Sequence, residues 1–166
     1  MSDLYAYRTA DLCDARAASV RVAMPILRDF GGLSCFAGQI ATVRTYEDNA
    51  LVRQALEEPG RSRVLVIDGG GSARCALVGD RLARLGADNG WAGLVVHGYV
   101  RDTAALAGIP IGVKALGAHP MRSAKRGAGE REVALTFASV TFSPGQYLYA
   151  DADGVVVTEQ PWDGAA

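Results

Sequence analysis

Apolar residues along the first two thirds of the chain follow two different periods in turn, which predicts strands alternating with helices. Alternating and β-branched residues at 39–46 predict a strand, and the continuous apolar runs at 64–67 and 94–96 predict two buried strands. Helical spacing of apolar residues, bounded by capping and stop residues, predicts helices at 9–18, 50–58, 80–88 and 103–107, the first with Thr9 as its N-cap. The two kinds of element are therefore expected to follow one another along the chain.

Beyond Pro110 the pattern changes, because short segments of strand composition are separated by Gly, Pro and Asp-Gly turns. Strands are expected at 111–116, 132–137, 140–142, 146–149 and 155–158. Residues 122–130 carry Arg122, Lys125 and Arg126 among glycines and alanines, which is typical of a basic surface loop. The predicted fold class is α/β or α+β, a mixed sheet covered by helices in a single compact domain over residues 1–166.

The amino-acid composition and charge argue against several classes of function. The 17 Lys and Arg residues are balanced by 18 Asp and Glu, so no overall positive field favours a polyanion, and direct binding of nucleic acid is not expected. No apolar run approaches the roughly 18 residues that span a bilayer, and the charged N-terminus is unlike a signal peptide. The three cysteines form no C-x-x-C pair, which fits a reducing compartment. We therefore expect a cytoplasmic protein with no membrane association.

Several motifs suggest sites but fit structural roles better. The loop Gly69-Gly70-Gly71 follows a strand, but Arg74 stands where a dinucleotide-binding loop needs glycine, and Ser72 breaks the methyltransferase pattern; tight turns are the better interpretation. Asp151-Ala152-Asp153-Gly154 lacks the later ligands of a calcium loop and predicts a hairpin turn. His97 is expected to be a hydrogen-bonded structural residue, and the cysteines are expected to serve buried packing.

A stronger candidate combines the start of the 80–88 helix with Arg101-Asp102, just beyond the 94–96 strand. The unpaired N–H groups from Gly79 to Leu82 could bind a carboxylate. An arginine can grip a carboxylate or a developing enolate oxygen, and an adjacent aspartate offers hard oxygen ligands to Mg²⁺ or Mn²⁺. The alternative is an exposed Arg-Asp pair, with Asp80 merely favouring the helix dipole.

These residues also resemble a known family. Asp80, twenty intervening residues and then Arg101-Asp102 look like the D-x20-R-D signature of class II pyruvate aldolases typified by 4-hydroxy-4-methyl-2-oxoglutarate aldolase. The similarity extends along nearly the whole chain to the compact branch named regulator of ribonuclease activity A. It is carried by Phe30-Gly31-Gly32, Glu47-Asp48-Asn49, residues 64–71, 76–80, 112–116, 140–142 and 149–151.

The resemblance implies a swivelling-type β/β/α sandwich assembled as a ring-shaped homotrimer, with active sites at subunit interfaces. It implies that the backbone of Gly79, Asp80, Arg81 and Leu82 holds the carboxylate of a 2-oxo acid substrate. Arg101 would contact the pyruvyl group, and Asp102 would anchor a divalent cation, Mg²⁺ or Mn²⁺, through its water shell. The implied activity is cleavage of 4-hydroxy-2-oxo acids to pyruvate, with oxaloacetate decarboxylation through the same stabilised enolate. Decarboxylation is the less demanding reaction because no hydroxyl must be deprotonated.

The family also implies alternatives. Its aldolases are longer than this chain and draw on an acidic residue from the C-terminal extension of a neighbouring subunit, whereas this sequence ends at Ala166, shortly after Glu159. Other members regulate a ribonuclease or helicase complex without catalysis, through the trimer surface and, here, the basic loop from Arg122 to Arg126. Such regulators usually lack the aspartate of the Arg-Asp pair, which this chain keeps. The family has also carried a menaquinone methyltransferase label, which the broken glycine motif argues against.

Overall fold

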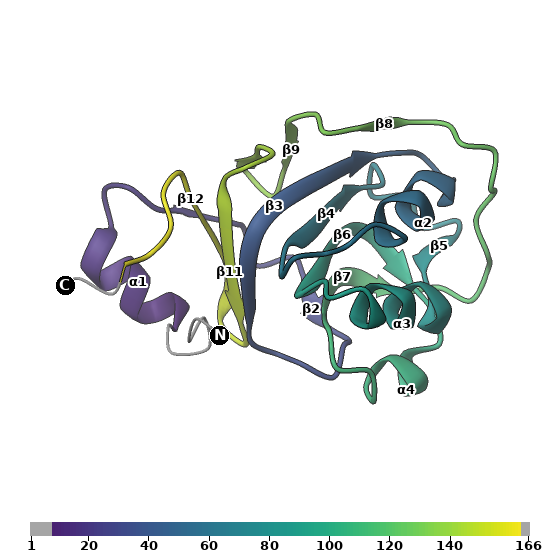
Figure 1. Ribbon diagram of the computed structural model, residues 1–166, viewed down its shortest axis with the longest axis horizontal. Coiled ribbons are helices and arrows are strands. Elements are labelled where there is room, and N and C mark those ends of the chain that lie inside the picture. Colours follow the sequence, from purple (N-terminus) through teal and green to yellow (C-terminus); the bar gives the residue numbers. More distant parts are fainter. Residues whose placement is uncertain (1–7, 164–166) are drawn as a thin grey trace.

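A curled mixed sheet organises the chain in the computed structural model, which describes residues 8–163 (Figure 1). The strand order across it is β1-β12-β11-β3-β4-β6-β7-β2, with β5 added to β6 and β8 to β3, while β9 and β10 form a separate hairpin. The elements are α1 (Thr9–Arg16), β1 (Arg21–Val22), β2 (Arg28–Asp29), β3 (Phe36–Arg44), α2 (Ala50–Leu56), β4 (Val64–Asp68), β5 (Ala76–Val78), α3 (Asp80–Asp88), β6 (Gly93–Val100), α4 (Thr103–Leu106), β7 (Gly112–Ala118), β8 (Glu130–Arg131), β9 (Leu135–Phe137), β10 (Val140–Phe142), β11 (Tyr147–Asp151) and β12 (Gly154–Thr158).

The centre of the sheet consists of four parallel strands, β3, β4, β6 and β7. Residues 64–67 and 94–96 are fully buried there, which explains why both segments are apolar without alternation. Successive residues nevertheless point to opposite sides: Leu65 and Ile67 enter one core cluster, whereas Val64 and Val66 enter the other. The sheet is therefore covered on both faces.

Helices cover only one of the two faces. Figure 1 shows α2, α3 and α4 together on that side, and their apolar residues pack against the sheet through Val52, Leu56, Leu82, Ala83 and Leu106. The opposite face is covered by the β9–β10 hairpin and by β11 and β12, whose inward residues surround Phe36 and Phe142. The result is an α+β arrangement, in agreement with the predicted class.

The first helix lies apart from the other three, beside β11 and β12 (Figure 1). It starts at Thr9, which is the first helical residue and not the predicted N-cap; that position belongs to Arg8. The Thr9 side chain does not fold back onto its own helix because Asp151 accepts both its N–H and its hydroxyl, each at 2.7 Å. Asp151 and Gly154 face each other in the β11–β12 hairpin, which confirms the predicted turn.

Several predicted boundaries need correction. The strand predicted at 132–137 is shortened to β9 at 135–137, because Glu132 adopts a left-handed conformation (φ 56°) that interrupts the extended chain, and the two-residue β8 lies before it in the segment predicted as a loop. The strand predicted at 39–46 runs instead from Phe36 to Arg44, and the short β1, β2 and β5 were not anticipated. The predicted domain 1–166 includes residues 1–7 and 164–166, which lie outside the described residues. Within residues 8–163, no helix is long and apolar enough to cross a membrane.

Candidate active site

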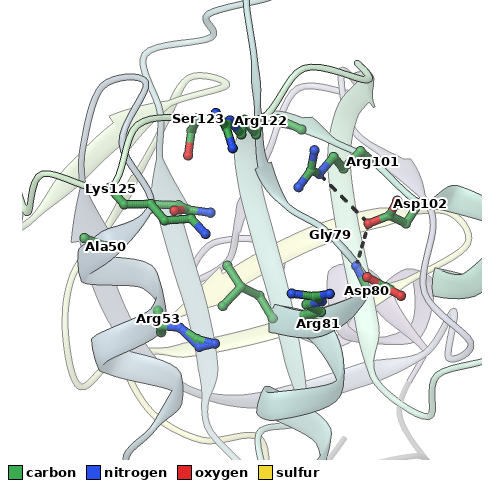
Figure 2. Close-up of a pocket in the computed structure, with 13 residues that line it drawn as sticks. Ala50, Arg53, Gly79, Asp80, Arg81, Arg101, Asp102, Arg122, Ser123 and Lys125 are labelled. Carbon is green, nitrogen blue, oxygen red and sulfur yellow. Dashed lines mark hydrogen bonds and ion pairs between the residues drawn. The ribbon is translucent and has the colours of Figure 1, made fainter.

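A pocket of about 570 Å³ opens where α2, the start of α3, the β6–α4 connection and the basic loop meet (Figure 2). This volume lies in the range of small-molecule sites, about 300–1,000 Å³. Its lining consists of Asn49, Ala50, Arg53, Ala76, Gly79, Asp80, Arg81, Leu82, Arg101, Asp102, Arg122, Ser123 and Lys125. All six residues predicted for the site therefore line one pocket, although Arg101 and Asp102 are about twenty positions away from the other four.

The N-terminus of α3 forms one side of this pocket. Gly79 is the N-cap, in an extended conformation, and the helix runs for nine residues from Asp80. The first-turn N–H groups of a helix have no acceptor four residues earlier, and here the N–H of Asp80 donates to Asp102 Oδ2 at 3.3 Å. In the described part of the chain, the N–H groups of Arg81 and Leu82 have no acceptor, and the positive end of the helix dipole lies behind them, so an anion could bind at this point.

Asp102 is held in an uncommon conformation at the pocket edge. Its backbone is left-handed (φ 58°, ψ 41°) and serves as the N-cap of α4. Aspartate tolerates this region better than most residues, at a strain of about 1–2 kcal/mol. Its Oδ2 lies 4.0 Å from Arg101 Nε, and both side chains are about two-fifths exposed. The carboxylate thus sits between a guanidinium and a helix N-terminus, and part of it faces solvent.

Gly79 makes room for that carboxylate. A Cβ atom at this position would lie 2.6 Å from Asp102 Oδ2 and 3.3 Å from Arg101 Cγ. A contact of 2.6 Å is shorter than real side chains adopt, so any other residue would displace the carboxylate. Gly79 is therefore needed because the Asp102 carboxylate approaches it closely, and not because its backbone is left-handed.

The other side of the pocket is formed by Arg53 of α2 and by Arg122, Ser123 and Lys125 of the basic loop (Figure 2). The sequence pattern predicts a surface loop here and no role for Arg53. The loop returns to the pocket because its backbone is bound by the 47–49 turn, through Ala124 N–H to Glu47 O at 2.9 Å and Asn49 N–H to Ala124 O at 3.1 Å. Nothing in the local sequence pattern reports such a contact between segments more than seventy residues apart.

Asp48 is the centre of this attachment. It is 2% exposed, and its carboxylate accepts the N–H of Ala50 at 3.0 Å and three loop N–H groups, those of Arg126, Gly127 and Ala128, at 2.7, 3.3 and 3.4 Å. Burial opposes ionisation of the carboxylate, but the four N–H groups together hold the pKa of Asp48 below its ordinary value. This buried carboxylate therefore fixes the loop that carries Arg122 and Lys125.

The pocket is strongly positive although the protein is not. Among its lining residues, five carry a positive charge, Arg53, Arg81, Arg101, Arg122 and Lys125, against the two carboxylates of Asp80 and Asp102, a local balance of +3. The complete sequence has a net charge of −1. Such a concentration of cations in a cleft raises the local concentration of anions. The arrangement suits a small ligand with more than one negative charge.

The pocket carboxylates could hold a divalent cation in only one of the usual modes. No group of three or more His, Cys, Asp or Glu side chains lies close enough to form a ligand set within residues 8–163. Mg²⁺ nevertheless binds in many sites through one or two carboxylates, keeping several waters and taking further oxygen ligands from its substrate. The half-exposed carboxylate of Asp102, beside an open pocket, fits that mode of binding.

The secondary candidates lie outside this pocket. His97 Nδ1 contacts Asp68 Oδ1 at 2.9 Å and its ring stacks on Phe137 at 4.6 Å, as expected for a hydrogen-bonded structural residue. Gly70 and Gly71 have φ of 65° and 71°, in agreement with tight turns. The three cysteines are free, and burial raises the pKa of each thiol, although only Cys75 is buried in full.

Comparison with known proteins places this architecture. The chain belongs to the family described as "RraA-like: Aldolase/RraA", which matches residues 9–157. A protein of Alkalilimnicola ehrlichii is 60% identical over 149 residues, 90% of this chain and 92% of its own length. A protein of Aromatoleum aromaticum is 55% identical over 153 residues, 92% and 96% of the two chains. Each is named "Putative 4-hydroxy-4-methyl-2-oxoglutarate aldolase".

Solved structures share the fold under other names. The structure of "S-adenosylmethionine: 2-dimethylmenaquinone methyltransferase" from Geobacillus kaustophilus matches with a TM-score of 0.92 and 48% identity, over 96% of this chain and 99% of that one. The structure of the "RNA-processing inhibitor RraA" from Thermus thermophilis gives the same score and identity, over 96% of each chain. Three kinds of function are thus attached to one fold, and the residues of the site must distinguish them.

Proposed function

We propose that this protein is a divalent-metal-dependent lyase that cleaves 4-hydroxy-2-oxo acids such as 4-hydroxy-4-methyl-2-oxoglutarate to pyruvate, and that also decarboxylates oxaloacetate. The observation that carries the proposal is the position of Asp102, held beside Arg101 and the N-terminus of α3 at the edge of a cationic pocket. The names of relatives at 52–60% identity support an aldolase. We expect the protein to carry out this reaction in the cytoplasm.

The proposed mechanism assigns one task to each part of the pocket. The N–H groups of Arg81 and Leu82 bind the carboxylate next to the 2-oxo group, which directs the 2-oxo oxygen towards Arg101. Asp102 would hold Mg²⁺ or Mn²⁺ through water, and the bound cation would supply Lewis-acid stabilisation of negative charge. When the C3–C4 bond of the substrate breaks, its electron pair passes to the pyruvyl fragment, and the Arg101 guanidinium donates to the developing enolate oxygen.

The two reactions differ in the product that carries C4 away. In aldol cleavage the C4 hydroxyl loses its proton as the carbonyl of the second product forms, whereas oxaloacetate loses carbon dioxide and needs no such base. In both cases a proton then adds to C3 of the enolate to give pyruvate. The pocket offers only Asp80 and Asp102 as carboxylates, and Asp102 is assigned to the cation. We therefore expect decarboxylation to be the less demanding activity.

Replacement of Asp102 by asparagine tests the proposal directly. Asparagine accepts the left-handed backbone and keeps an oxygen for the N–H of Asp80, but it removes the charge. We expect kcat/KM to fall at least about 100-fold, equivalent to about 2.7 kcal/mol of transition-state stabilisation. Pyruvate release would be followed from both substrates with Mg²⁺, Mn²⁺ or EDTA, because free metal alone decarboxylates oxaloacetate. A fully active, EDTA-insensitive Asp102→Asn protein would contradict the proposal.

A second candidate function is regulation of a ribonuclease E-type or helicase complex, and the 48% identity to a protein named as an RNA-processing inhibitor favours it. Association would then use the surface of a homotrimeric ring, including the basic loop, and would weaken with salt. Co-purification with such a complex at low salt, lost in an Arg126→Gln variant, would support this function. Light scattering would test the ring, with an expected mass of about three times 17.4 kDa.

A further inference from the structure

A second cleft lies outside the active-site pocket, at the carboxyl ends of the parallel strands β3 and β4. It has a volume of about 560 Å³ and shares no lining residue with the first pocket. Tyr46, Asp68 and Gly70 line it near the ends of those strands, and residues 128–130 line it from the segment that leads into β8. Ligands of parallel sheets commonly bind at this edge, and the volume suits a small molecule.

Tyr46 forms an aromatic wall of this cleft. The residue is 59% exposed, which is unusual for a large side chain that is held in place. One side of its ring packs on the main chain of Gly70, where a Cβ atom would lie 3.0 Å from Tyr46 Cδ2. Its hydroxyl interacts with the side chains of Glu47 and Arg74. The ring is therefore fixed at one side and at its tip, and much of its surface remains accessible.

Asp68 supplies an acceptor to the same cleft. Its Oδ1 accepts the N–H of Gly70 at 2.9 Å and contacts His97 Nδ1 at 2.9 Å. Among residues 8–163, no group donates to the other oxygen, Oδ2. The side chain is only 18% exposed, so solvent compensates this oxygen incompletely. A ligand that donates a hydrogen bond to Oδ2 would complete the set, most strongly if the ligand is cationic.

The charge of this cleft is opposite to that of the active-site pocket. Its lining contains the carboxylates of Asp68 and Glu130 but only one cation, Arg44. The Arg44 guanidinium already donates to Glu130 and to Ala134 O, each at 2.9 Å. A local balance of −1 favours a cation over an anion.

The type of cation follows from the other lining residues. Gly70, Ala128 and Gly129 bring no polar side chain into the cleft, so few acceptors are present. An ammonium group is compact and strongly hydrated, and it needs acceptors in three directions. A guanidinium group is planar and more weakly hydrated; it stacks on aromatic rings and donates within its own plane. An aromatic wall beside one free carboxylate oxygen therefore suits a guanidinium group better.

We propose that this cleft is a binding site for small molecules that carry a guanidinium group, which stacks on the Tyr46 ring and donates to Asp68 Oδ2. None of the residues of this site takes part in the proposed lyase mechanism, so the inference does not rest on that function. The two pockets would bind ligands of opposite charge, an anion beside Arg101 and a cation beside Asp68.

Binding is tested with two monocations that differ only in the charged group. Butylguanidinium and butylammonium carry the same alkyl chain, and each would be titrated into the full-length protein by calorimetry. We expect butylguanidinium to bind at least about tenfold more tightly, because only its planar group can stack and donate at once. Equal affinities, or no binding of butylguanidinium at millimolar concentration, would overturn the site.

Variants locate the binding in this cleft. We expect Tyr46→Leu and Asp68→Asn each to weaken butylguanidinium at least about tenfold, because the first removes the aromatic face and the second removes the charge. Asparagine keeps an oxygen for the N–H of Gly70, and thermal unfolding would verify that both variants fold. Tyr46→Phe keeps the ring and should retain the wild-type affinity. Unchanged binding by Tyr46→Leu would overturn the proposal.

Glu132→Gln is the matched charge control. Glu132 is exposed and lies two residues beyond Glu130, but it does not line the cleft. Its loss should change the affinity by less than about twofold. A loss as large as that of Asp68→Asn would show that the general negative field attracts the ligand, and would contradict a specific site.

A third compound distinguishes a small-molecule ligand from an arginine side chain of another protein. N-acetyl-arginine methylamide carries the same guanidinium group on a peptide backbone. We expect it to bind no more tightly than butylguanidinium, because the cleft provides contacts for the charged group and its alkyl chain only. Clearly tighter binding of the peptide compound would assign the cleft to a protein partner and overturn the small-molecule site.

Discussion

At the scale of single residues, the position of the Asp102 carboxylate depends on three local features. Asp102 occupies a left-handed conformation, its Oδ2 accepts the N–H of Asp80, and Gly79 provides the space in which that oxygen lies. Each of these features constrains the same atom from a different side. The Arg-Asp pair is thus defined by its placement as well as by its chemical type, and a substitution that leaves both residues intact can still move the carboxylate.

Gly79→Ala is expected to do so. The added methyl group would displace Asp102 Oδ2, which can rotate away, so the fold should tolerate the change while kcat/KM falls about tenfold or more. Activity assays beside thermal unfolding would show a large kinetic loss with a small shift in Tm. Gly108→Ala is the control, because its Cβ would meet only Ala105 O at 3.7 Å. Equal activity of both variants would show that the close approach is irrelevant to the reaction.

At the scale of elements, two buried or half-buried aspartates attach segments that are distant in sequence. Asp48 holds the basic loop against the start of α2, and Asp151 holds the first residue of α1 against the β11–β12 turn. Both use oxygen atoms to accept N–H groups of a segment about 80 or 140 positions away. Only the first attachment borders the pocket, so the two provide a natural comparison.

Asp48→Asn should weaken both stability and catalysis. An NH2 group would replace one carboxylate oxygen, and the N–H groups that now donate to that oxygen would face another donor in a buried site, at a cost of about 3 kcal/mol. We also expect kcat/KM to fall about tenfold at temperatures where the variant is folded, because the loop carries Arg122 and Lys125. Asp151→Asn should lower stability with less than a twofold effect on kcat/KM. Similar losses of kcat/KM in the two variants would show that the lower activity of Asp48→Asn follows from its lower stability alone.

Sequence reasoning reached the elements and residues that have local signatures and missed those that depend on distant contacts. The buried central strands are visible as apolar runs, and the Arg101-Asp102 pair is visible through its fixed spacing from Asp80. The strands β1, β2 and β5 have two or three residues each, too few to show a period. Lys125 joins the site because the Asp48 attachment holds its loop, and Arg53 joins it because α2 contacts α3, and no spacing along the chain expresses either contact.

At the scale of the whole molecule, Asp48 and Asp151 make the stability of the fold sensitive to acid. Burial opposes the ionisation of Asp48 and of Asp151, yet the N–H groups they accept, with the Thr9 hydroxyl in the second case, hold the pKa of each carboxyl below its ordinary value. Between the folded and unfolded pKa values, the unfolded chain therefore binds more protons. The contribution of both groups is present above about pH 4, the usual aspartate value, and is lost as the pH falls through the lowered folded-state values.

Unfolding by urea between pH 6 and pH 2.5 would measure this dependence. We expect the free energy of unfolding to fall with acidity below about pH 4, and Asp48→Asn to show a shallower fall than the wild type because one of the linked groups is missing. The comparison uses slopes, so the lower starting stability of the variant does not obscure it. An unchanged slope would mean that the Asp48 carboxylate has the same pKa in the folded and unfolded chains.

The loop attachment also bears on how such a protein can diversify. Asp48 accepts main-chain N–H groups only, so it imposes a shape on residues 126–128 and leaves most side chains in the loop unconstrained, apart from Gly127 and Gly129 with φ of 85° and 127°. Arg122 and Lys125 can therefore be exchanged for other residues without rebuilding the scaffold. One aspartate would allow related proteins to acquire new ligands by substitution on a loop of constant form, a simple route by which a shared architecture comes to serve different tasks.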